Sequence, residues 1–287
     1  MATLKAIRKR IGSVRNTQQI TKAMKMVSAA KLRRAQEAAV AARPYAEKMT
    51  ELLKNLAARV SSDAHPLLRA REEKKILLLL FTSDRGLCGG YNANLIRAAE
   101  AFMRRNRDKE IALTLVGRKG ADHFRRRRAN VVDRYIGALA TPAEELAAEI
   151  AQKLIARFLS GEADAVYVLY SHFRSALSQV PTLEKLLPVS VGASGEGEAP
   201  PMTEYLYEPG VAQLLASLLP RIAEVATQRA FLEATASEHG ARMTAMDSAT
   251  SNASKMIGSL TLQMNRARQA SITRELMEIV GTAEALK

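Results

Sequence analysis

The C-terminal stretch of the chain, residues 209–283, constrains the fold most, because its pattern predicts one very long helix. Between Met243 and Ser271 nine positions recur in alternating steps of three and four, a 3.5-residue period typical of a coiled-coil seam. The seam residues are Met243, Met246, Thr250, Ala253, Ile257, Leu260, Met264, Ala267 and Ser271. A helix of roughly 75 residues extends about 110 Å, so we expect it to reach beyond any compact domain of this chain.

Small residues occupy much of this seam, where a permanent zipper prefers Leu and Ile. They are Thr250, Ala253, Ala267 and Ser271. The pattern then shifts by one residue, and its further positions are Ile272, Leu276, Ile279 and Ala283. One interpretation is a solvated structural coiled coil. Because small residues bury little apolar area, the seam instead favours a rod that needs a surrounding partner.

Composition restricts the class of protein further. The 287 residues are 47% hydrophobic but only 5% aromatic, which suits helices rich in Ala and Leu better than an all-β core. The net charge of +14 predicts acidic partners, namely nucleic acid, anionic lipid or an acidic protein surface. The longest apolar run, residues 76–81, is far shorter than the roughly 20 residues of a membrane span. The single cysteine, Cys88, excludes an internal disulfide and fits a reducing compartment.

The N-terminal segment predicts a second long helix at about residues 3–58. Residues 1–36 contain ten Lys or Arg and no acidic residue, a composition shared with organellar transit peptides. The helical pattern continues well past such a peptide, which argues against that interpretation. Its apolar positions are Leu4, Ile7, Ile11 and Val14, then Ile20, Met24 and Val27, then Tyr45, Met49, Leu52 and Leu56. Pro44 removes one backbone hydrogen bond, so we expect a bend there.

Between the two helices the pattern changes to that of an α/β domain. The predicted strands are residues 76–81, 111–116, 130–136 and 165–170, and the predicted helices are residues 92–106 and 142–159. Thr141, Pro142 and Glu144 are typical of a helix start. This alternation predicts a Rossmann-like, three-layer α/β domain with a mainly parallel sheet. A loop rich in Pro and Gly, residues 192–201, follows it.

The predicted organisation therefore has three parts. Residues 1–60 form an N-terminal shaft helix, residues 74–205 an α/β foot domain, and residues 209–287 a C-terminal shaft helix. Because the first and last segments have matching seams, we expect them to pair as a long antiparallel coiled coil. The C-terminal helix is longer, so one end of the rod is expected to be a single helix.

The best candidate for chemistry is a glycine-rich turn, residues 84–90 (DRGLCGG), between a strand and a helix. A phosphate cradle belongs at such a place, but the spacing matches neither the dinucleotide fingerprint nor the phosphate loop. A structural turn or a protein contact is therefore favoured. No histidine is near Cys88 in the sequence to act as its base, and no group of residues has metal-ligand spacing. We expect no catalytic residue, no cofactor and no metal.

Two smaller features leave alternatives open. A run of four arginines, residues 125–128, could touch phosphates, but a solvated basic face is favoured. Tyr205 and Tyr207 fit either strand packing or an exposed aromatic contact.

Three stretches resemble the γ subunit family of F-type ATP synthases. They are residues 4–36 (LKAIRKRIGSVRNTQQITKAMKMVSAAKLRRAQ), residues 82–94 (TSDRGLCGGYNAN) and residues 266–286 (RARQASITRELMEIVGTAEAL), the last preceded by EHGARMTAMDSATSNA. The resemblance covers nearly the whole chain. Thr282 departs from the Gly or Ala usual in the family. The cysteine pair of the light-regulated chloroplast form is absent, so thiol switching is not expected.

The resemblance implies that this chain catalyses no reaction itself. In that family the two helices form a shaft inside a ring of alternating α and β subunits, and the α/β domain sits on the membrane c ring beside the ε subunit. Ion flow turns the c ring and the shaft, whose asymmetry drives three β sites through different affinities for ATP and ADP. The implied location is the cytoplasmic face of the bacterial inner membrane, as a peripheral protein with one copy per complex.

The resemblance also assigns contact residues. Those for the ring of α and β subunits are Lys22, Met24, Lys25, Cys88, Arg266, Arg268, Gln269 and Thr273. Those for the c ring at the foot are Tyr205, Tyr207 and Glu208. The charge agrees with an acidic partner, because residues 248–274 contain no acidic residue.

Two other functions remain as alternatives. A basic helical protein could bind nucleic acid, although the sequence has no groove-reading motif and no aromatic platform. A nucleotide-dependent enzyme could be built on the α/β domain, although its glycine turn has the wrong spacing.

Overall fold

A computed structural model describes residues 4–57, 65–137, 143–189 and 210–285. The helices are α1 (Leu4–Ala57), α2 (Tyr91–Arg105), α3 (Arg118–Arg126), α4 (Ala143–Leu159) and α5 (Val211–Ala285). The strands are β1 (Lys75–Phe81), β2 (Glu110–Val116), β3 (Val131–Tyr135), β4 (Ala165–Phe173) and β5 (Gln179–Leu187). The predicted long terminal helices, the four predicted strands and the helices between them are confirmed. Thr141, Pro142 and the loop at 192–201 lie outside the described residues.

The chain forms two compact units, each of which includes part of α1 and part of α5. The two-helix unit consists of residues 1–28 and 243–287, and the sheet unit consists of residues 29–242. Helix α1 continues through Pro44 as a single helix. The predicted three-part division at residues 60, 74, 205 and 209 stays a prediction.

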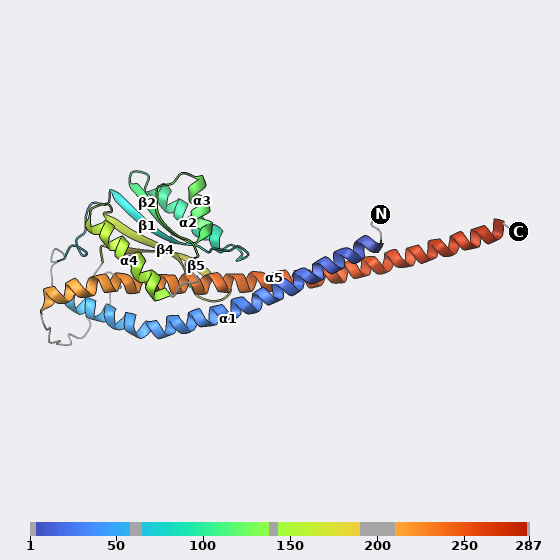
Figure 1. Cartoon of the computed structure of the whole chain (residues 1–287), viewed down its shortest axis with the longest axis horizontal. Helices are drawn as coiled ribbons and strands as arrows, with labels where there is room; N and C mark the ends of the chain where they lie inside the picture. The colour runs from blue at the N-terminus through green and yellow to red at the C-terminus, as the bar shows by residue number, and fades with distance from the viewer. Residues whose placement is uncertain (1–3, 58–64, 138–142, 190–209, 286–287) are drawn as a thin grey trace. The chain divides into compact units, whose positions relative to one another are not determined.

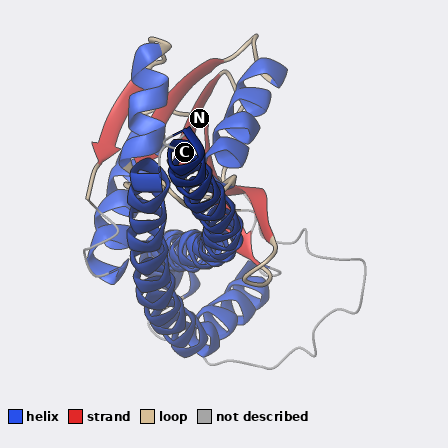
Figure 2. Ribbon diagram, turned by 90° about the vertical axis from the view of Figure 1, so that its right-hand side faces the viewer, coloured by secondary structure: helices blue, strands red, loops and turns tan. Residues whose placement is uncertain are grey.

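The sheet unit has a five-stranded, mainly parallel sheet in the order β3-β2-β1-β4-β5. Strand β5 pairs antiparallel with β4 and was not predicted from the sequence. It lies at the sheet edge, where Pro181 is tolerated. Apart from the buried Leu186 and Leu187 its side chains are partly buried or exposed, and it has no continuous apolar run. Helices cover both faces of the sheet, which confirms the predicted three-layer fold (Figures 1 and 2).

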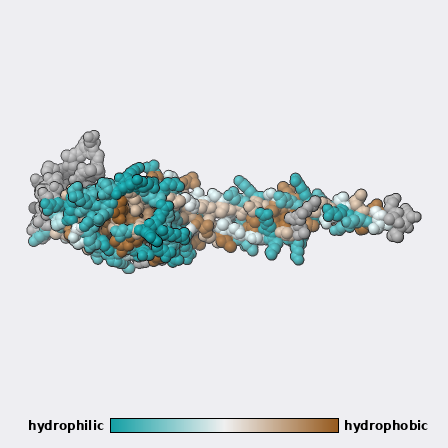
Figure 3. All heavy atoms as spheres, turned by 90° about the horizontal axis from the view of Figure 1, so that it is seen from above, coloured by the Kyte–Doolittle hydropathy of each residue, from teal (hydrophilic) through white to brown (hydrophobic). Residues whose placement is uncertain are grey.

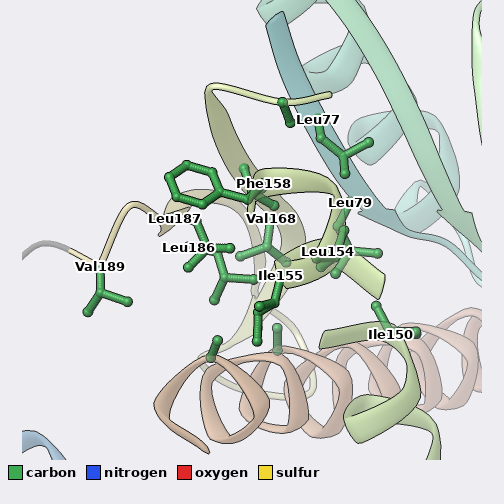
Figure 4. Packing of buried hydrophobic residues seen from close by; sticks show 14 of the residues in the cluster. Leu77, Leu79, Ile150, Leu154, Ile155, Phe158, Val168, Leu186, Leu187 and Val189 are labelled. Atoms are coloured by element: carbon green, nitrogen blue, oxygen red, sulfur yellow. The ribbon is translucent and has the colours of Figure 1, made fainter. Parts of the chain in front are cut away.

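Strand β1 is the centre of the core, because it contributes side chains to both faces of the sheet. Leu77, Leu79 and Phe81 join one cluster with α4 and α5, while Leu78 and Leu80 join the other with α2 and α3. Burial on both faces explains the continuous apolar run that the sequence shows. Figure 4 shows Leu77 and Leu79 beside Ile150, Leu154 and Phe158 of α4.

The first half of α5 belongs to this core. The α5 residues in the cluster beside α4 are Leu215, Leu219, Ala223, Ala230, Phe231 and Ala234. The ring of Phe231 meets that of Phe81 edge to face at 5.9 Å between centroids. The long helix is therefore fixed in the sheet unit by packing before it enters the two-helix unit.

In the two-helix unit α1 and α5 run antiparallel, as predicted. Three pairs of side chains set the register: Lys25 with Asp247 at 2.6 Å, Thr21 with Thr250 at 2.8 Å, and Gln18 with Ser254 at 2.6 Å. All nine predicted seam positions between 243 and 271 are buried or half-buried. The seam of α5 is therefore confirmed.

The predicted seam of α1 is partly wrong. Ile11 is buried, but Ile20 and Val27 are 60% and 57% exposed, whereas Thr21 and Ser28 are buried. Counted from Ile11 in alternating steps of three and four, the buried face of α1 includes Thr21 and Ser28. Each lies one residue after a predicted apolar seam position, Ile20 or Val27. Register with the partner helix decides which positions are buried, so polar side chains fill the seam and apolar ones face outward.

The expected extension of the α5 seam is not buried either. Ile272, Leu276 and Ile279 are 49%, 57% and 64% exposed. If the register set by these three pairs continues along both helices, Leu4, the first residue of α1 that the structure describes, lies opposite Arg268. Beyond that point no described residue of α1 lies opposite α5, which agrees with the predicted single helix at this end.

Candidate functional site

The glycine turn, residues 84–90, follows β1 and is tied to the ends of two neighbouring strands. Oδ1 of Asp84 accepts hydrogen bonds from the backbone N–H of Arg118 and of Gly137, both at 3.0 Å. The hydroxyl of Thr82 donates to the carbonyl oxygen of Val116 at 2.9 Å. Gly117 has φ +92°, and a Cβ there would lie 2.0 Å from the carbonyl oxygen of Thr82, so only glycine fits.

Cys88 in this turn is buried, at 2% exposure. Its sulfur accepts a hydrogen bond from Nδ2 of Asn92 at 3.1 Å and lies 3.7 Å from the hydroxyl oxygen of Ser83. None of these groups is a base that could activate a thiol. The side chain packs the turn, so any contact that the turn makes with another protein falls to its exposed neighbours, Arg85 and Leu87.

Arg242 of α5 fastens the same turn. Its Nη2 donates to the carbonyl oxygen of Arg85 at 3.1 Å and its Nε to that of Gly86 at 3.4 Å. Nη1 forms an ion pair with Glu238 at 2.7 Å, and both side chains are buried. The turn therefore presents carbonyl oxygens to a guanidinium, whereas a phosphate needs N–H groups. This polarity supports the interpretation of the turn as structural.

Helix α5 also fills the crevice where doubly wound sheets bind ligands. Such ligands lie at the carboxyl ends of the strands, where the strand order reverses, here between β1 and β4. The hydroxyl of Tyr91 donates to the carbonyl oxygen of Ala234 at 3.1 Å, and that of Ser237 to the carbonyl oxygen of Ser171, at the end of β4, at 2.7 Å. These bonds hold α5 against this edge of the sheet.

Burial shifts the protonation of the groups around Arg242. It raises the pKa of Glu238, against the opposing effect of Arg242, and one carboxylate oxygen of Glu238 has no partner. Burial and the positive charges of Arg242 and Lys31 lower the pKa of His239 to about 4. His239 is therefore neutral at physiological pH. Within this cluster Arg242 holds the backbone of the glycine turn, which is a structural role.

The remaining predicted contact residues lie in the two-helix unit. On α1, Lys22 is exposed, Met24 is half-buried and Lys25 pairs with Asp247. On α5, the exposed members are Arg266, Arg268, Gln269 and Thr273. The structure does not bring these two sets together, because Lys25 lies opposite Asp247, about five helical turns from Arg266. Tyr205, Tyr207 and Glu208 lie outside the described residues.

Sequence analysis missed Glu238 and Arg242. Their spacing of four residues is visible in the sequence, but it is also typical of an exposed helix pair, so it gives no sign of burial.

The described residues offer few other candidate sites. Within the described residues, no group of His, Cys, Asp and Glu could hold a metal ion, and no described helix is long and apolar enough to cross a membrane. A cavity of about 810 Å³ lies in the sheet unit between α1, α4 and α5, lined by alanines and by charges of both signs, among them Arg43, Glu144 and Arg221. The surface in Figure 3 is mainly hydrophilic over the sheet unit, with apolar patches on the paired helices.

The chain thus combines an antiparallel helix pair with an α/β domain in which α5 packs against the ends of the strands. The family model described as ATP synthase matches residues 3–286. The chain is 54% identical to the ATP synthase gamma chain of Geobacter metallireducens and 51% identical to that of Anaeromyxobacter dehalogenans, each aligned over the full length of both chains. The chain therefore belongs to the gamma chain family of ATP synthases.

Solved structures show the same fold. A chain of the Euglena gracilis mitochondrial ATP synthase, in a complex of OSCP, F1 and c ring, matches with a TM-score of 0.72 at 21% identity, covering 99% of this chain and 94% of that one. A chain of the Tetrahymena thermophila central stalk and c ring matches with a TM-score of 0.61 at 26% identity, covering 80% of this chain and 99% of that one. These matches give no support to the nucleic-acid alternative.

Proposed function

We propose that this chain is the central rotary stalk of a bacterial F-type ATP synthase. It couples ion-driven rotation of the membrane c ring to the conformational cycle of the catalytic β subunits. The α and β subunits surround its helix pair, and the sheet unit contacts the ε subunit and the c ring. The chain is peripheral, at the cytoplasmic face of the inner membrane, and is present once per complex.

The observation that carries this proposal is the surface of α5 beyond Ser271. Ile272, Leu276 and Ile279 are exposed in the chain by itself, and isolated helices do not keep such a row of apolar residues in water without a partner. The preceding stretch, residues 248–274, has no acidic residue. A surrounding partner with apolar and acidic surfaces fits both features.

The mechanism needs only differences in contact energy. A rotor shifts a subunit between conformations when its contacts with them differ in free energy. Arg266 and Arg268 lie two residues apart, about 200° around the helix, so they face different sides of α5. Each therefore meets a different part of an enclosing ring. The other proposed ring contacts are Lys22, Met24, Lys25, Gln269, Thr273 and the turn that contains Cys88; those at the foot are Tyr205, Tyr207 and Glu208.

The test is a double variant, Arg266→Ala with Arg268→Ala, in purified complexes of verified subunit stoichiometry. Arginine suits fixed carboxylate partners because its planar fork bonds through two atoms. Losing one desolvated interfacial pair costs about 2–5 kcal/mol, so we expect turnover to fall by about tenfold or more. The matched control, Arg125→Ala with Arg126→Ala, removes two exposed charges from the sheet unit and should leave turnover unchanged. Equal rates in both double variants would contradict the proposed ring contacts.

A further inference from the structure

Arginines gather where α2 and α3 end. Arg104 and Arg105 belong to the last turn of α2 and Arg107 comes shortly after it, while Arg127 and Arg128 directly follow α3. All five are exposed, and together they are called the basic face. Residues 91–136 contain twelve Lys or Arg and five Asp or Glu, so this segment carries a net charge of +7, half of the +14 of the whole chain.

The topology of the sheet unit brings the two helix ends together. Strands β1, β2 and β3 are parallel, so the helices between them run the opposite way and both end at the edge where the strands begin. Both helices pack on the same face of the sheet (Figure 1). Nη1 of Arg127 forms an ion pair with Glu100 of α2 at 2.7 Å, and Glu100 lies one helical turn before Arg104. The arginines after α3 therefore adjoin those at the end of α2.

Most of this charge has no partner within the described part of the chain. Apart from the pair with Glu100, no described carboxylate forms an ion pair with the basic face. Cations near a helix C-terminus are stabilised by the helix dipole, but this effect falls off within the last turn. It accounts for the two arginines within α2 and not for Arg107 and Arg128, which lie outside the helices. Because like charges repel one another, crowding them opposes folding, and a partner that supplies negative charge removes this cost.

The surroundings of the basic face indicate the kind of partner. In residues 91–135, all of which the structure describes, no large hydrophobic side chain is exposed. Stable protein interfaces are centred on aromatic and aliphatic anchors, and single-stranded nucleic acids are bound on exposed aromatic platforms; this surface has neither. An anionic lipid surface requires positive charge alone, and each Lys or Arg near it raises the affinity about fivefold.

We propose that the basic face binds the headgroup phosphates of anionic phospholipids. This inference rests on the proposed function and deepens it, because a stalk that stands on the membrane c ring is held beside a lipid surface. Headgroups are mobile and equivalent, so they supply negative charge at every rotational angle and favour none. Such a contact holds the sheet unit at the membrane without stopping its rotation.

The first test measures binding to lipid vesicles of the purified complex of this chain with the α and β subunits, without the c ring. On the proposed function the basic helix pair is enclosed in that complex, so it does not add to vesicle binding. At physiological salt we expect binding to vesicles of phosphatidylcholine that contain phosphatidylglycerol, and none to pure phosphatidylcholine. The combined variant Arg104→Gln, Arg105→Gln, Arg107→Gln and Arg128→Gln should bind at least about a hundredfold more weakly.

A matched control removes four exposed cations from other parts of the sheet unit. It combines Lys31→Gln, Arg34→Gln, Arg43→Gln and Arg174→Gln, so it changes the net charge equally. Charges far from the lipid contact are screened by salt, so this control should lose less than about threefold in affinity. Equal losses in the two variants would overturn the inference, because they would show a response to net charge alone.

A third variant distinguishes a lipid surface from a fixed site. Lys at the same four positions of the basic face keeps the charge at the helix ends, so it should fold and bind vesicles as the wild type does. Fixed carboxylates of a protein partner would instead favour the planar arginine fork over lysine. Loss of vesicle binding with Lys would overturn the inference, as would tighter binding of the wild type to random duplex DNA at the same phosphate concentration.

The inference and the proposed function fail separately, because one is judged by lipid binding and the other by turnover. If the Gln variant binds vesicles as the wild type does while the double variant of Arg266 and Arg268 loses turnover, only the inference fails. Loss of the ε subunit or the c ring from the complete complex of the Gln variant would show that the basic face binds a protein, and would overturn the choice of lipid. If this chain forms no complex with α and β subunits, both fail.

Discussion

The guanidinium of Arg242 and the carboxylate of Glu238 form an ion pair at 2.7 Å, one turn apart on α5, and both side chains are less than a tenth exposed. Among the described residues, most ion pairs include at least one exposed side chain, and exposed pairs contribute little to stability. This pair differs because each charge is removed from water and because Arg242 also holds two carbonyl oxygens of the glycine turn. It connects α5 to the end of β1.

We predict that Arg242→Ala destabilises the full chain by about 3–5 kcal/mol, because it leaves Glu238 as an uncompensated buried charge. One oxygen of Glu238 already lacks a partner. Replacing both residues, Arg242→Met with Glu238→Leu, should cost less than Arg242→Ala alone. Denaturant unfolding of the three chains measures this, and a double variant less stable than the single one would refute the explanation.

The stability of the sheet unit should depend on pH through His239. The pKa of His239 is about 4 in the folded chain and about 6.5 when unfolded, so between these values the unfolded state binds more protons. Stability should therefore fall as pH decreases from 6.5 to 4, by about 2 kcal/mol after allowance for partial exposure. His239→Gln should remove this part of the pH dependence, measured by urea unfolding across that range. Identical pH profiles for both chains would show that His239 does not contribute.

Cys88→Ala should leave ATP turnover of assembled complexes nearly unchanged. The sulfur is buried and contacts Ser83 and Asn92, so its removal costs packing, about 1–2 kcal/mol of stability. In the folded wild-type chain, Cys88 should react with a thiol reagent only as fast as the turn opens. Loss of turnover in a complete complex would restore a catalytic or phosphate-binding interpretation of the turn.

Amide hydrogen exchange should differ along α5 in the isolated full chain. Residues 272–282 are all exposed, so their amides should exchange fastest, because helices without tertiary packing are marginal in water. Amides near the buried Met246 and Ala253 should be slower, and those of β1 slowest. Uniform protection from 243 to 282 would mean that the end of the helix is stabilised without a partner.

Some features of this protein follow from the sequence alone because their signals are local. The α5 seam between Met243 and Ser271 is a spacing along a single helix, and the apolar run of β1 reflects burial on both faces of a strand. The order of strands and helices then requires a mainly parallel sheet. The resemblance of the terminal segments to a known family provides the function.

Other features were decided by partners distant in sequence. Thr21 and Ser28, not Ile20 and Val27, are buried on α1, because the register with α5 selects the seam regardless of polarity. Strand β5 forms at the edge of the sheet because it pairs with β4, although its sequence lacks the apolar pattern typical of a strand. Glu238 and Arg242 have the spacing of a surface pair, yet the packing of α5 over the β1 turn buries them. Only tertiary structure shows that Cys88 is enclosed while its neighbour Leu87 is exposed, because the fixed backbone of the turn sets the direction of each side chain.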